Sequence, residues 1–355
     1  MTKTVSDTVI PVADGKALMA LFIAHIRDEH EIELEETGDG TRFFEQEGFR
    51  LDLRSDPRGL YVRIEGPNAN DLVFLKEEIA GHVAEIDATA AGNIRWSGET
   101  AQEGALPANF KVLQVVSTSE VFPGLYRVTL SHDDVSSLAA GGVHLRLMMP
   151  LDRSRTPVWP RMAANGAPVW PQDENRLHAR FVTLRSVRPA HGEVDIDIVC
   201  HRGGLISDWA QKANKGQTVG VMGPAGNTVI PADATRICLA ADGTGLASVA
   251  RLMETLPDGV EGDVVVAFAS AGDARDYLPE GPLRLHAIEP ARFDAEIGAA
   301  VRDLTRDTSI HYAYFAGEFE NAQDLRRYYK THLGLDKTRQ ISTAYWRRGV
   351  PGYGS

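Results

Sequence analysis

The sequence predicts several domains in one chain: an N-terminal α+β module, a six-stranded antiparallel β-barrel, and a C-terminal α/β domain with a doubly wound parallel sheet. Its 355 residues suffice for two or three domains. Strand-like runs with hairpin punctuation fill residues 110–225, and strands alternate with helices from Arg236 onward. We therefore expect the domains at residues 1–98, 108–230 and 231–355.

The N-terminal module is predicted to close two helices over a small antiparallel sheet. Asp14 can cap a helix over residues 15–27, and Asn68 can start a second helix that runs to about residue 85. Four strand-like runs separated by turn residues lie between these helices, at residues 32–36, 42–45, 48–54 and 59–65. The stretch 97–107 is typical of a linker.

The middle of the chain is predicted to be the barrel. Six strand-like runs occur there, at residues 111–117, 124–131, 143–149, 176–188, 194–201 and 218–222. Together with one helix over 207–215 they fit a closed six-stranded barrel. Four prolines fall in or beside the insert 159–173, which is expected to be an ordered loop.

The last part of the chain is predicted to be the doubly wound sheet. Its strands are expected at residues 236–241, 263–269, 284–288, 311–316 and 343–346. Its helices are expected at residues 246–256, 293–303 and 321–333. Strict alternation of the two kinds of element favours parallel strands with crossover helices.

Composition and charge exclude several classes of function. The net charge is −12, of which residues 1–100 carry −10, so a nucleic-acid partner is disfavoured because phosphate contacts need clustered basic surface. No apolar run approaches the ~20 residues that span a bilayer, and no signal peptide is expected. The two cysteines, Cys200 and Cys238, fall in separate predicted strands and indicate no disulfide framework. We therefore expect a cytoplasmic protein.

One stretch of the predicted barrel contains the candidate ligand-binding residues. Arg180 and Thr183 lie on one predicted strand, and Gly204 opens a predicted helix that contains Ser207. An arginine fork suits a pyrophosphate, a threonine hydroxyl can donate to or accept from a flavin ring edge, and a helix start receives an anion. This set is what a flavin adenine dinucleotide (FAD) site on a small barrel requires.

The same stretch, with four further motifs, resembles the siderophore-interacting proteins. The motifs are Trp159-Pro160-Arg161-Met162, Arg180–Arg185, His201 with Gly204–Ala210, Gly223-Pro224-Ala225-Gly226, Phe315-Ala316-Gly317-Glu318 and Tyr345-Trp346-Arg347-Arg348-Gly349. They occur in order over roughly residues 108–350. The resemblance implies an FAD-dependent ferric-siderophore reductase of the ferredoxin-reductase-like superfamily, with NAD(P)H or ferredoxin as electron donor. Residues 1–98 resemble a domain of unknown function that is fused to some members.

The resemblance also implies which residues form the site. The cofactor-binding set is Arg180, Phe181, Val182, Thr183, Arg185, His201, Gly204, Leu205, Ile206, Ser207, Trp209, Asp242 and Thr244. Trp346, Arg347 and Arg348 are expected to meet the ferric siderophore, whose negative charge and flat rings suit arginine and aromatic faces. No catalytic acid or base and no bound metal is expected, because electron transfer from a flavin edge needs proximity only.

The chain departs from the family pattern at three places. Val182 stands where the family has an aromatic residue that stacks on the flavin, and neighbouring Phe181 faces the other side of a regular strand. Arg185 matches the motif but faces opposite Arg180 unless a bulge intervenes. The Gly204–Ser207 segment and the turn Ala241-Asp242-Gly243-Thr244 match their family counterparts only in part.

Several alternatives remain open at this point. Trp209 suits helix-to-barrel packing or an adenine contact, and His201 suits a structural hydrogen bond or a ligand contact. The segment 345–348 suits a packed tryptophan with solvated arginines as well as a substrate surface. Instead of a siderophore reductase, the chain could be a general NAD(P)H-dependent ferric or flavin reductase, or a non-catalytic siderophore- or partner-binding protein.

Overall fold

The computed structural model describes residues 4–30, 32–46, 48–98, 102–139, 142–201, 203–225, 229–306 and 309–350. Part of the expected linker, residues 99–101, and Gly226 of the fourth motif lie outside the described residues. The chain divides into two compact units. The first consists of Met1–Lys111, Met148–His178 and Gly220–Asn227, and the second of Val112–Leu147, Ala179–Val219 and Thr228–Ser355. The three domain ranges expected from the sequence stay a prediction.

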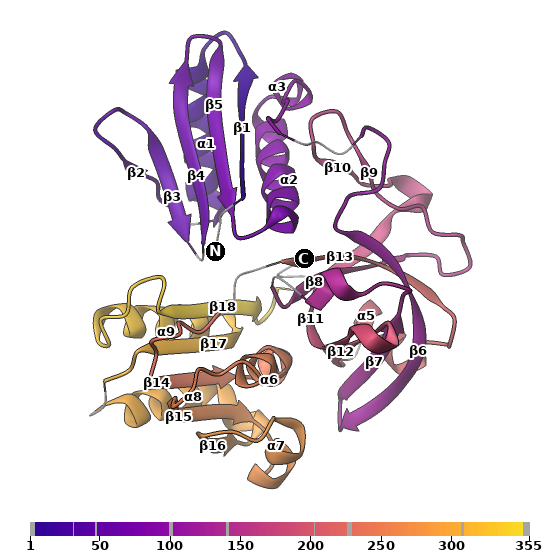
Figure 1. Ribbon diagram of the computed structural model, residues 1–355, viewed down its shortest axis with the longest axis vertical. Coiled ribbons are helices and arrows are strands. Elements are labelled where there is room, and N and C mark those ends of the chain that lie inside the picture. Colours follow the sequence, from indigo (N-terminus) through magenta and orange to yellow (C-terminus); the bar gives the residue numbers. More distant parts are fainter. Residues whose placement is uncertain are drawn as a thin grey trace. The chain divides into compact units, whose positions relative to one another are not determined.

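The N-terminal module has the predicted α+β form (Figure 1). Its elements are β1 (Thr4–Pro11), α1 (Gly15–His30), β2 (Glu35–Glu36), β3 (Arg42–Gln46), β4 (Phe49–Asp56), β5 (Gly59–Gly66), α2 (Ala69–Ile86) and α3 (Ala88–Gly92). The sheet is antiparallel in the order β1-β5-β4-β3-β2, and one apolar core joins it to the two long helices. Both predicted caps are present, with Asp14 accepting from the N–H of Ala17 at 2.9 Å and Asn68 from that of Asp71 at 3.1 Å.

Strand β1 and helix α3 are the elements of this module that the sequence did not reveal. The inward face of β1 is largely polar, because Ser6 and Thr8 are buried there. Their hydroxyls donate to the carbonyls of Ser97 and Arg95 at 2.9 and 2.7 Å, respectively. A strand that satisfies its buried face through distant carbonyls shows no apolar alternation, so periodicity missed it.

The barrel closes in the order β11-β12-β7-β6-β13-β8, which confirms the predicted six-stranded barrel. Its strands are β6 (Phe110–Phe122), β7 (Leu125–Ser131), β8 (His144–Pro150), β11 (Leu177–Arg188), β12 (Glu193–Val199) and β13 (Thr218–Ala225). Two short helices accompany them, α4 (Ser136–Ala139) and α5 (Leu205–Lys212). The proline-rich insert is ordered around a small hairpin of β9 (Arg161–Met162) and β10 (Pro168–Val169).

The C-terminal sheet is parallel throughout, in the order β16-β15-β14-β17-β18 (Figure 1). Its elements are β14 (Arg236–Ala241), α6 (Leu246–Met253), β15 (Glu261–Ala267), α7 (Ala271–Tyr277), β16 (Leu283–Ile288), α8 (Pro290–Thr305), β17 (Tyr312–Glu318), α9 (Phe319–Thr331) and β18 (Gln340–Trp346). Alternate β14 residues face two different cores, with α6 and α7 on one side and α8 and α9 on the other. This arrangement confirms the predicted doubly wound sheet.

Of the described residues, none belongs to a helix that is both long and apolar enough to cross a bilayer.

Candidate cofactor and reduction site

Arg180 lies near the start of β11 and is half-buried. One of its Nη atoms donates to the carbonyl of Ala179 at 2.7 Å, and burial lowers the pKa of the guanidinium. Within the described part of the chain no carboxylate pairs with it. A buried positive charge is costly unless an anion compensates it, so Arg180 is suited to an anionic ligand.

The two residues after Arg180 point to opposite sides of the strand. Phe181 is 41% exposed, and the guanidinium carbon of Arg146 lies 5.0 Å from the centre of its ring. Val182 is half-buried on the other side. The aromatic face at this end of β11 therefore belongs to Phe181, in contact with Arg146, and not to residue 182.

Thr183 follows on the same strand and is buried, at only 5% exposed. The pairing of β11 with β12 is irregular between Leu184 and Ser186, which is where the sequence needed a bulge to reconcile the motif with strand geometry. Arg185 at this irregularity forms an ion pair with Glu254, at 2.6 Å between Nη1 and Oε1.

Helix α5 begins at the same end of the barrel. Because Leu184 of β11 is paired with Ile196 of antiparallel β12, the start of β11 and the end of β12, which leads into α5, lie together. No side chain among the described residues caps α5 at Gly204. A helix start is a place where an anion can bind through backbone N–H groups.

Gly204 is required by close packing. A Cβ atom there would lie 2.7 Å from Cε1 of His201 and 2.8 Å from the Ser207 hydroxyl. That hydroxyl accepts from the backbone N–H of His201 at 3.0 Å, so Ser207 and His201 hold the turn into α5. The imidazole of His201 thus lies against Gly204 at the N-terminus of α5.

The remaining predicted residues of α5 differ in exposure. Trp209 is fully buried, and its indole N–H has no partner within the described residues, which favours the packing role. Ile206 is buried as well, whereas Leu205 is 44% exposed. Apolar side chains at these positions leave the backbone N–H groups of the helix start unchanged.

Asp242 links the first strand-to-helix turn of the sheet to the end of its last strand. Its carboxylate accepts from the Thr244 hydroxyl at 2.6 Å and from the Trp346 indole at 2.7 Å. Burial raises the pKa of Asp242, and these two hydrogen bonds oppose that shift. A Cβ atom at Gly317 would lie 2.8 Å from the same carboxylate, so β17 approaches the turn closely. Asp242, Thr244 and Trp346 are therefore one cluster.

Arg347 and Arg348 follow Trp346 and are both exposed, but their surroundings differ. Arg348 forms an ion pair with Asp294 at 2.7 Å. The guanidinium carbon of Arg347 lies 4.4 Å from the centre of the Phe319 ring. Within the described ranges, a carboxylate thus offsets the charge of Arg348 but not that of Arg347.

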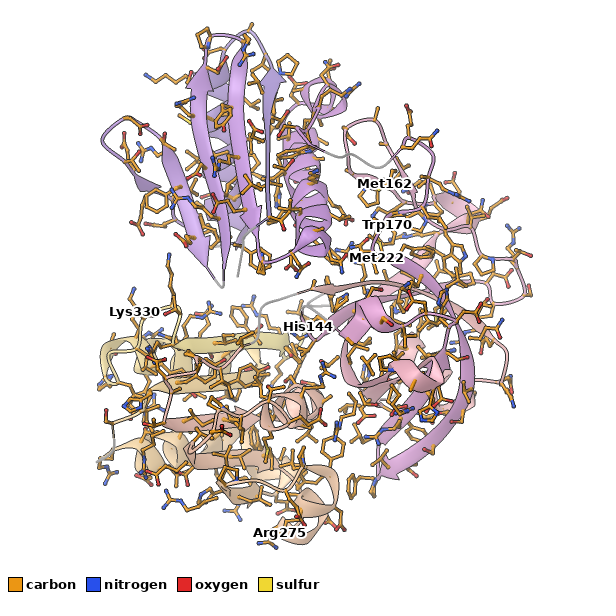
Figure 2. The ribbon with its side chains drawn as sticks, in the orientation of Figure 1. His144, Met162, Trp170, Met222, Arg275 and Lys330 are labelled. Atoms are coloured by element: carbon orange, nitrogen blue, oxygen red, sulfur yellow. The ribbon has the colours of Figure 1, made fainter. Side chains whose placement is uncertain are left out.

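Sequence reasoning did not single out His144 as a site residue, although the structure places it beside Tyr345. The His144 Nε2 and the Tyr345 hydroxyl are 3.3 Å apart, and the two rings meet edge to face. Figure 2 labels His144, which lies on β8. A histidine at the start of a largely apolar barrel strand was the signal that could have identified it.

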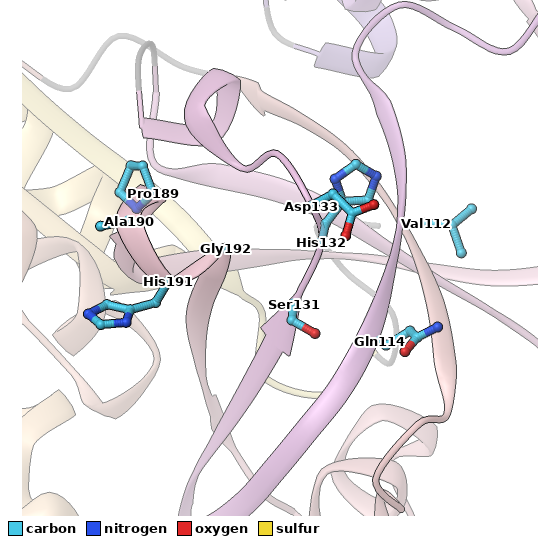
Figure 3. A pocket seen from close by; sticks show the side chains of 9 residues that line it. All are labelled: Val112, Gln114, Ser131, His132, Asp133, Pro189, Ala190, His191 and Gly192. Carbon is cyan, nitrogen blue, oxygen red and sulfur yellow. The ribbon is translucent and has the colours of Figure 1, made fainter.

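A hollow of about 480 Å³ lies elsewhere on the barrel (Figure 3). It is lined by Val112, Gln114, Ser131, His132, Asp133, Pro189, Ala190, His191 and Gly192. Gly192 precedes β12 and Ser131 ends β7, so the hollow is at the opposite end of these strands from α5. No group of three or more His, Cys, Asp or Glu side chains in the described ranges can hold a metal ion.

The residues present fit a flavin nucleotide. Arg180 offers a charge that no carboxylate among the described residues compensates, α5 begins at a glycine whose place a larger residue could not take, and Thr183 offers a hydroxyl. A barrel with this set, followed by a doubly wound parallel sheet, is typical of an FAD-dependent oxidoreductase.

Comparison with known families agrees with this class. The model of the siderophore-interacting FAD-binding domain matches residues 114–228, and that of the siderophore-interacting protein matches residues 234–349. The chain belongs to the siderophore-interacting protein family. Residues before 114 lie outside both models.

Characterised relatives are similar over the same part of the chain. The ferric vibriobactin reductase ViuB of Vibrio cholerae is 24% identical over 246 residues, which are 67% of this chain and 90% of the relative. The NADPH-dependent ferric-chelate reductase of Escherichia coli is 26% identical over 242 residues, covering 67% and 92%.

Solved structures show the same fold. The siderophore-interacting protein SipS from Aeromonas hydrophila has a TM-score of 0.57 at 25% identity and covers 69% of this chain and 94% of its own. A siderophore utilization protein from T. fusca has a TM-score of 0.59 at 25% identity, covering 71% and 97%.

Proposed function

We propose that this protein reduces ferric siderophores with FAD held on its barrel, and thereby releases iron as Fe(II). The observation that carries the proposal is the uncompensated, half-buried charge of Arg180 at the barrel end where α5 begins without a side-chain cap. The names of the relatives, a ferric vibriobactin reductase and a ferric-chelate reductase, support the same substrate class. The cytoplasmic location expected from the sequence stays a prediction.

The barrel residues take the binding roles in this proposal. Arg180 holds the pyrophosphate, together with the start of helix α5. Thr183 meets the flavin ring edge, and Phe181 supplies the nearest aromatic face in place of Val182. Arg185 is engaged with Glu254, so its contribution is to fix the bulge.

Bound FAD accepts two electrons as a hydride and can pass them on singly, as a one-electron iron acceptor requires. Siderophore oxygen ligands are hard donors that hold Fe(III) better than Fe(II), so reduction loosens the complex. The chain therefore needs no general acid or base for electron transfer. Its own residues bind, orient and shield the reacting groups.

The C-terminal sheet is proposed to receive the electron donor, NADPH or NADH, with ferredoxin as the alternative. In a doubly wound sheet the ligand crevice lies at the carboxyl ends of the strands, where Asp242, Thr244 and Trp346 form their cluster. The relative from Escherichia coli is named as NADPH-dependent, which supports the nucleotide over ferredoxin.

The segment after β18 is proposed to meet the ferric siderophore. Trp346 is half-buried and fixed by Asp242, and the two arginines that follow it are exposed. Fixed positive charge at this edge would raise the encounter rate of an anionic iron complex.

Two measurements test the proposed function. The purified protein should show the visible absorption spectrum of bound flavin, which should bleach on anaerobic addition of NADPH or NADH. The reduced protein should then reduce ferric siderophores faster than simple ferric chelates such as ferric citrate. Equal rates on both would favour a general ferric reductase, and absence of flavin after reconstitution with FAD would overturn the proposal.

A further inference from the structure

One tyrosine joins a helix of the C-terminal sheet to the barrel within the second compact unit. Tyr277 is the last residue of α7 and is 5% exposed. Its hydroxyl donates to Oδ2 of Asp197 on β12 at 2.7 Å. Burial raises the pKa of Tyr277 well above its usual value, so the hydroxyl keeps its proton and remains the donor of this hydrogen bond.

The barrel itself fixes the position of Asp197. Arg127 is its direct cross-strand partner on β7 and donates to both carboxylate oxygens, at 2.8 and 2.7 Å. The Asp197 side chain is only 1% exposed. A guanidinium fork on a carboxylate has a specific geometry, so the acceptor for the Tyr277 hydroxyl has a fixed place on the barrel.

A second polar contact runs beside the first one. Arg185 of β11 forms its ion pair with Glu254, the residue that follows α6, and its guanidinium carbon lies 5.5 Å from the centre of the Tyr277 ring. Strands β7, β11 and β12 of the barrel thus contact helices α6 and α7 through polar side chains. We call this set the barrel–sheet junction: Arg127, Arg185, Asp197, Glu254 and Tyr277.

The barrel–sheet junction lies at the ligand-binding edge of the sheet. Phe268 directly follows β15, and its ring packs edge to face on Phe122 of the barrel strand β6, with ring centres 5.3 Å apart. The Phe122 ring also contacts that of Tyr277, at 6.1 Å. In a doubly wound sheet the carboxyl ends of the strands form the ligand crevice. The barrel therefore meets the sheet at the edge proposed to receive the electron donor.

The barrel–sheet junction also lies at the barrel end proposed to bind FAD. Arg185 is two positions after Thr183 on β11. Asp197 is two positions before the end of β12, the strand that leads into α5. The same few side chains are thus close in sequence to the proposed flavin contacts and in direct contact with the helices of the sheet.

Polar contacts fix a position that apolar packing alone leaves adjustable. Leu125, Phe122 and Val199 of the barrel share one apolar core with the sheet. Apolar burial has no preferred direction, whereas a hydrogen bond weakens steeply with misalignment. The Tyr277 hydroxyl therefore determines where the sheet lies against the barrel within the freedom that the apolar core allows.

We propose that Tyr277, Asp197 and Arg185 are positioning residues that hold the donor-binding sheet and the flavin-binding barrel in place for hydride transfer. This inference rests on the proposed function, with NADPH or NADH as donor. In that step a C–H bond of the nicotinamide ring breaks, and the hydrogen passes with both electrons to the flavin ring. The nucleotide is oxidised and the flavin is reduced. Such a step is slowed about 100-fold by a displacement of 1 Å.

The kinetic test is anaerobic stopped-flow reduction of FAD-loaded Tyr277→Phe by NADPH and by NADH. We expect the limiting rate constant of flavin reduction to fall about tenfold, less than for a full 1 Å displacement because the aromatic ring stays. The apparent dissociation constants of the nucleotide and of FAD should stay within about twofold of wild type. Reduction by dithionite, which needs no site on the sheet, should keep its wild-type rate.

Tyr329→Phe is the matched control. It removes the same atom from a fully buried tyrosine of α9 whose hydroxyl has no partner in the described part of the chain. Its limiting rate constant should equal that of the wild type. A variant that is merely less stable loses flavin amplitude, while the molecules that stay folded react at the wild-type rate. An equal fall of the rate constant in both variants would overturn the inference.

Hydrogen exchange of the apoprotein gives a readout without cofactor. In Tyr277→Phe the backbone N–H groups of α7 should exchange about tenfold faster than in the wild type, because the helix loses its contact with Asp197. Those of α9 should exchange at the wild-type rate. Unchanged exchange in α7 would overturn the inference, and so would faster exchange together with an unchanged rate constant of flavin reduction.

Failure of this inference can be told from failure of the proposed function. A wild-type protein without a flavin spectrum after reconstitution overturns both, as does one whose bound FAD neither nucleotide reduces. A wild type that NADPH or NADH reduces, with an equal rate constant in Tyr277→Phe, overturns the inference alone. If Tyr277→Phe does not fold, Glu254→Gln replaces it, because this partly exposed carboxylate holds Arg185. An unchanged rate constant in that variant would likewise overturn the inference.

Discussion

An arginine lies near each end of strand β11, and the two guanidinium groups differ in their partners. Arg188 at the far end donates to Asp195 at 2.9 Å and to Glu193 at 3.1 Å, and its hydrogen bonds to these carboxylates raise its pKa. Arg180 at the near end donates only to the carbonyl of Ala179 among the described residues, and burial lowers its pKa.

This difference separates a charge that stabilises the fold from one that is kept for a ligand. Asp195 is 5% exposed and also accepts from Thr129 and Ser186, so the Arg188 end is satisfied by the protein itself. At the Arg180 end the compensating anion has to come from outside the chain. The four predictions below test whether the two ends differ as sharply as their contacts indicate.

The largest effect is expected for Arg180→Ala on cofactor affinity. Loss of a charge-assisted contact to pyrophosphate should weaken FAD binding by about 1.5–3 kcal/mol, or roughly 10- to 150-fold. Titration of the apoprotein with FAD, followed by flavin fluorescence, measures this change. The free energy of unfolding without FAD should stay the same, because Arg180 has no ion pair with any residue that the structure describes. Unchanged FAD affinity would place the pyrophosphate elsewhere.

The second prediction concerns Arg188→Ala, which should act on stability and leave cofactor affinity alone. Removal of the guanidinium strands the buried carboxylate of Asp195. We expect a loss of about 2 kcal/mol in the free energy of unfolding, less than the roughly 3–5 kcal/mol for a fully buried pair, because Arg188 is partly solvated. Urea denaturation of the apoproteins measures it. A weaker FAD affinity in the folded variant would contradict the contrast between the two ends.

The third prediction is a pH dependence at the Arg188 end. Burial alone would raise the pKa of Asp195, but hydrogen bonds from Arg188, Ser186 and Thr129 outweigh it and hold the pKa below its usual value. A carboxyl group whose pKa is lower in the folded state stabilises the protein above about pH 4 and loses that contribution as the pH falls.

Asp195→Asn should therefore flatten the acid side of the stability profile. Between pH 6 and pH 3 the wild type should lose more free energy of unfolding than the variant does, by about 1 kcal/mol. Urea denaturation at several pH values gives both profiles. Parallel profiles would show that Asp195 does not titrate differently in the folded and unfolded chains.

The smallest effect is expected at the end of β18, where the same contrast recurs between neighbours. Arg348 is paired with Asp294, whereas Arg347 lies over the Phe319 ring. Arg347→Ala should raise the Michaelis constant for an anionic ferric siderophore about threefold at low salt, and Arg348→Ala should raise it less. Steady-state kinetics at two salt concentrations checks this, with a neutral ferric complex as the control acceptor. Equal effects on both acceptors would show that these arginines stabilise the fold and do not bind the siderophore.

Much of the fold could be predicted because it depends on patterns among neighbouring residues. The caps Asp14 and Asn68, the hairpin punctuation of the barrel and the alternation of strands and helices after Arg236 all occur within short windows. Helix α7 was missed although Ser270 caps it, accepting from the N–H of Asp273 at 3.1 Å, because seven residues give little periodicity.

The candidate site could be predicted only as a set of residues. Arg180, Thr183 and the start of α5 follow from the order of motifs, and their roles toward FAD stay predictions. The ion pair of Arg185 with Glu254 and the hydrogen bond of Trp346 to Asp242 could not be predicted. No pattern in a single sequence indicates which distant side chains come into contact.

The sequence by itself determined most of the helices and strands, the six strands of the barrel and the family of the chain, because capping, periodicity and motifs act over neighbouring residues. Only the tertiary structure decided which groups are satisfied and which are left for a ligand. The Trp346 indole reaches Asp242 across 104 positions and the Tyr345 hydroxyl reaches His144 across 201. Hydrogen bonds and charges depend on distance in space, so the contrast between Arg180 and Arg188 exists only once the chain has folded.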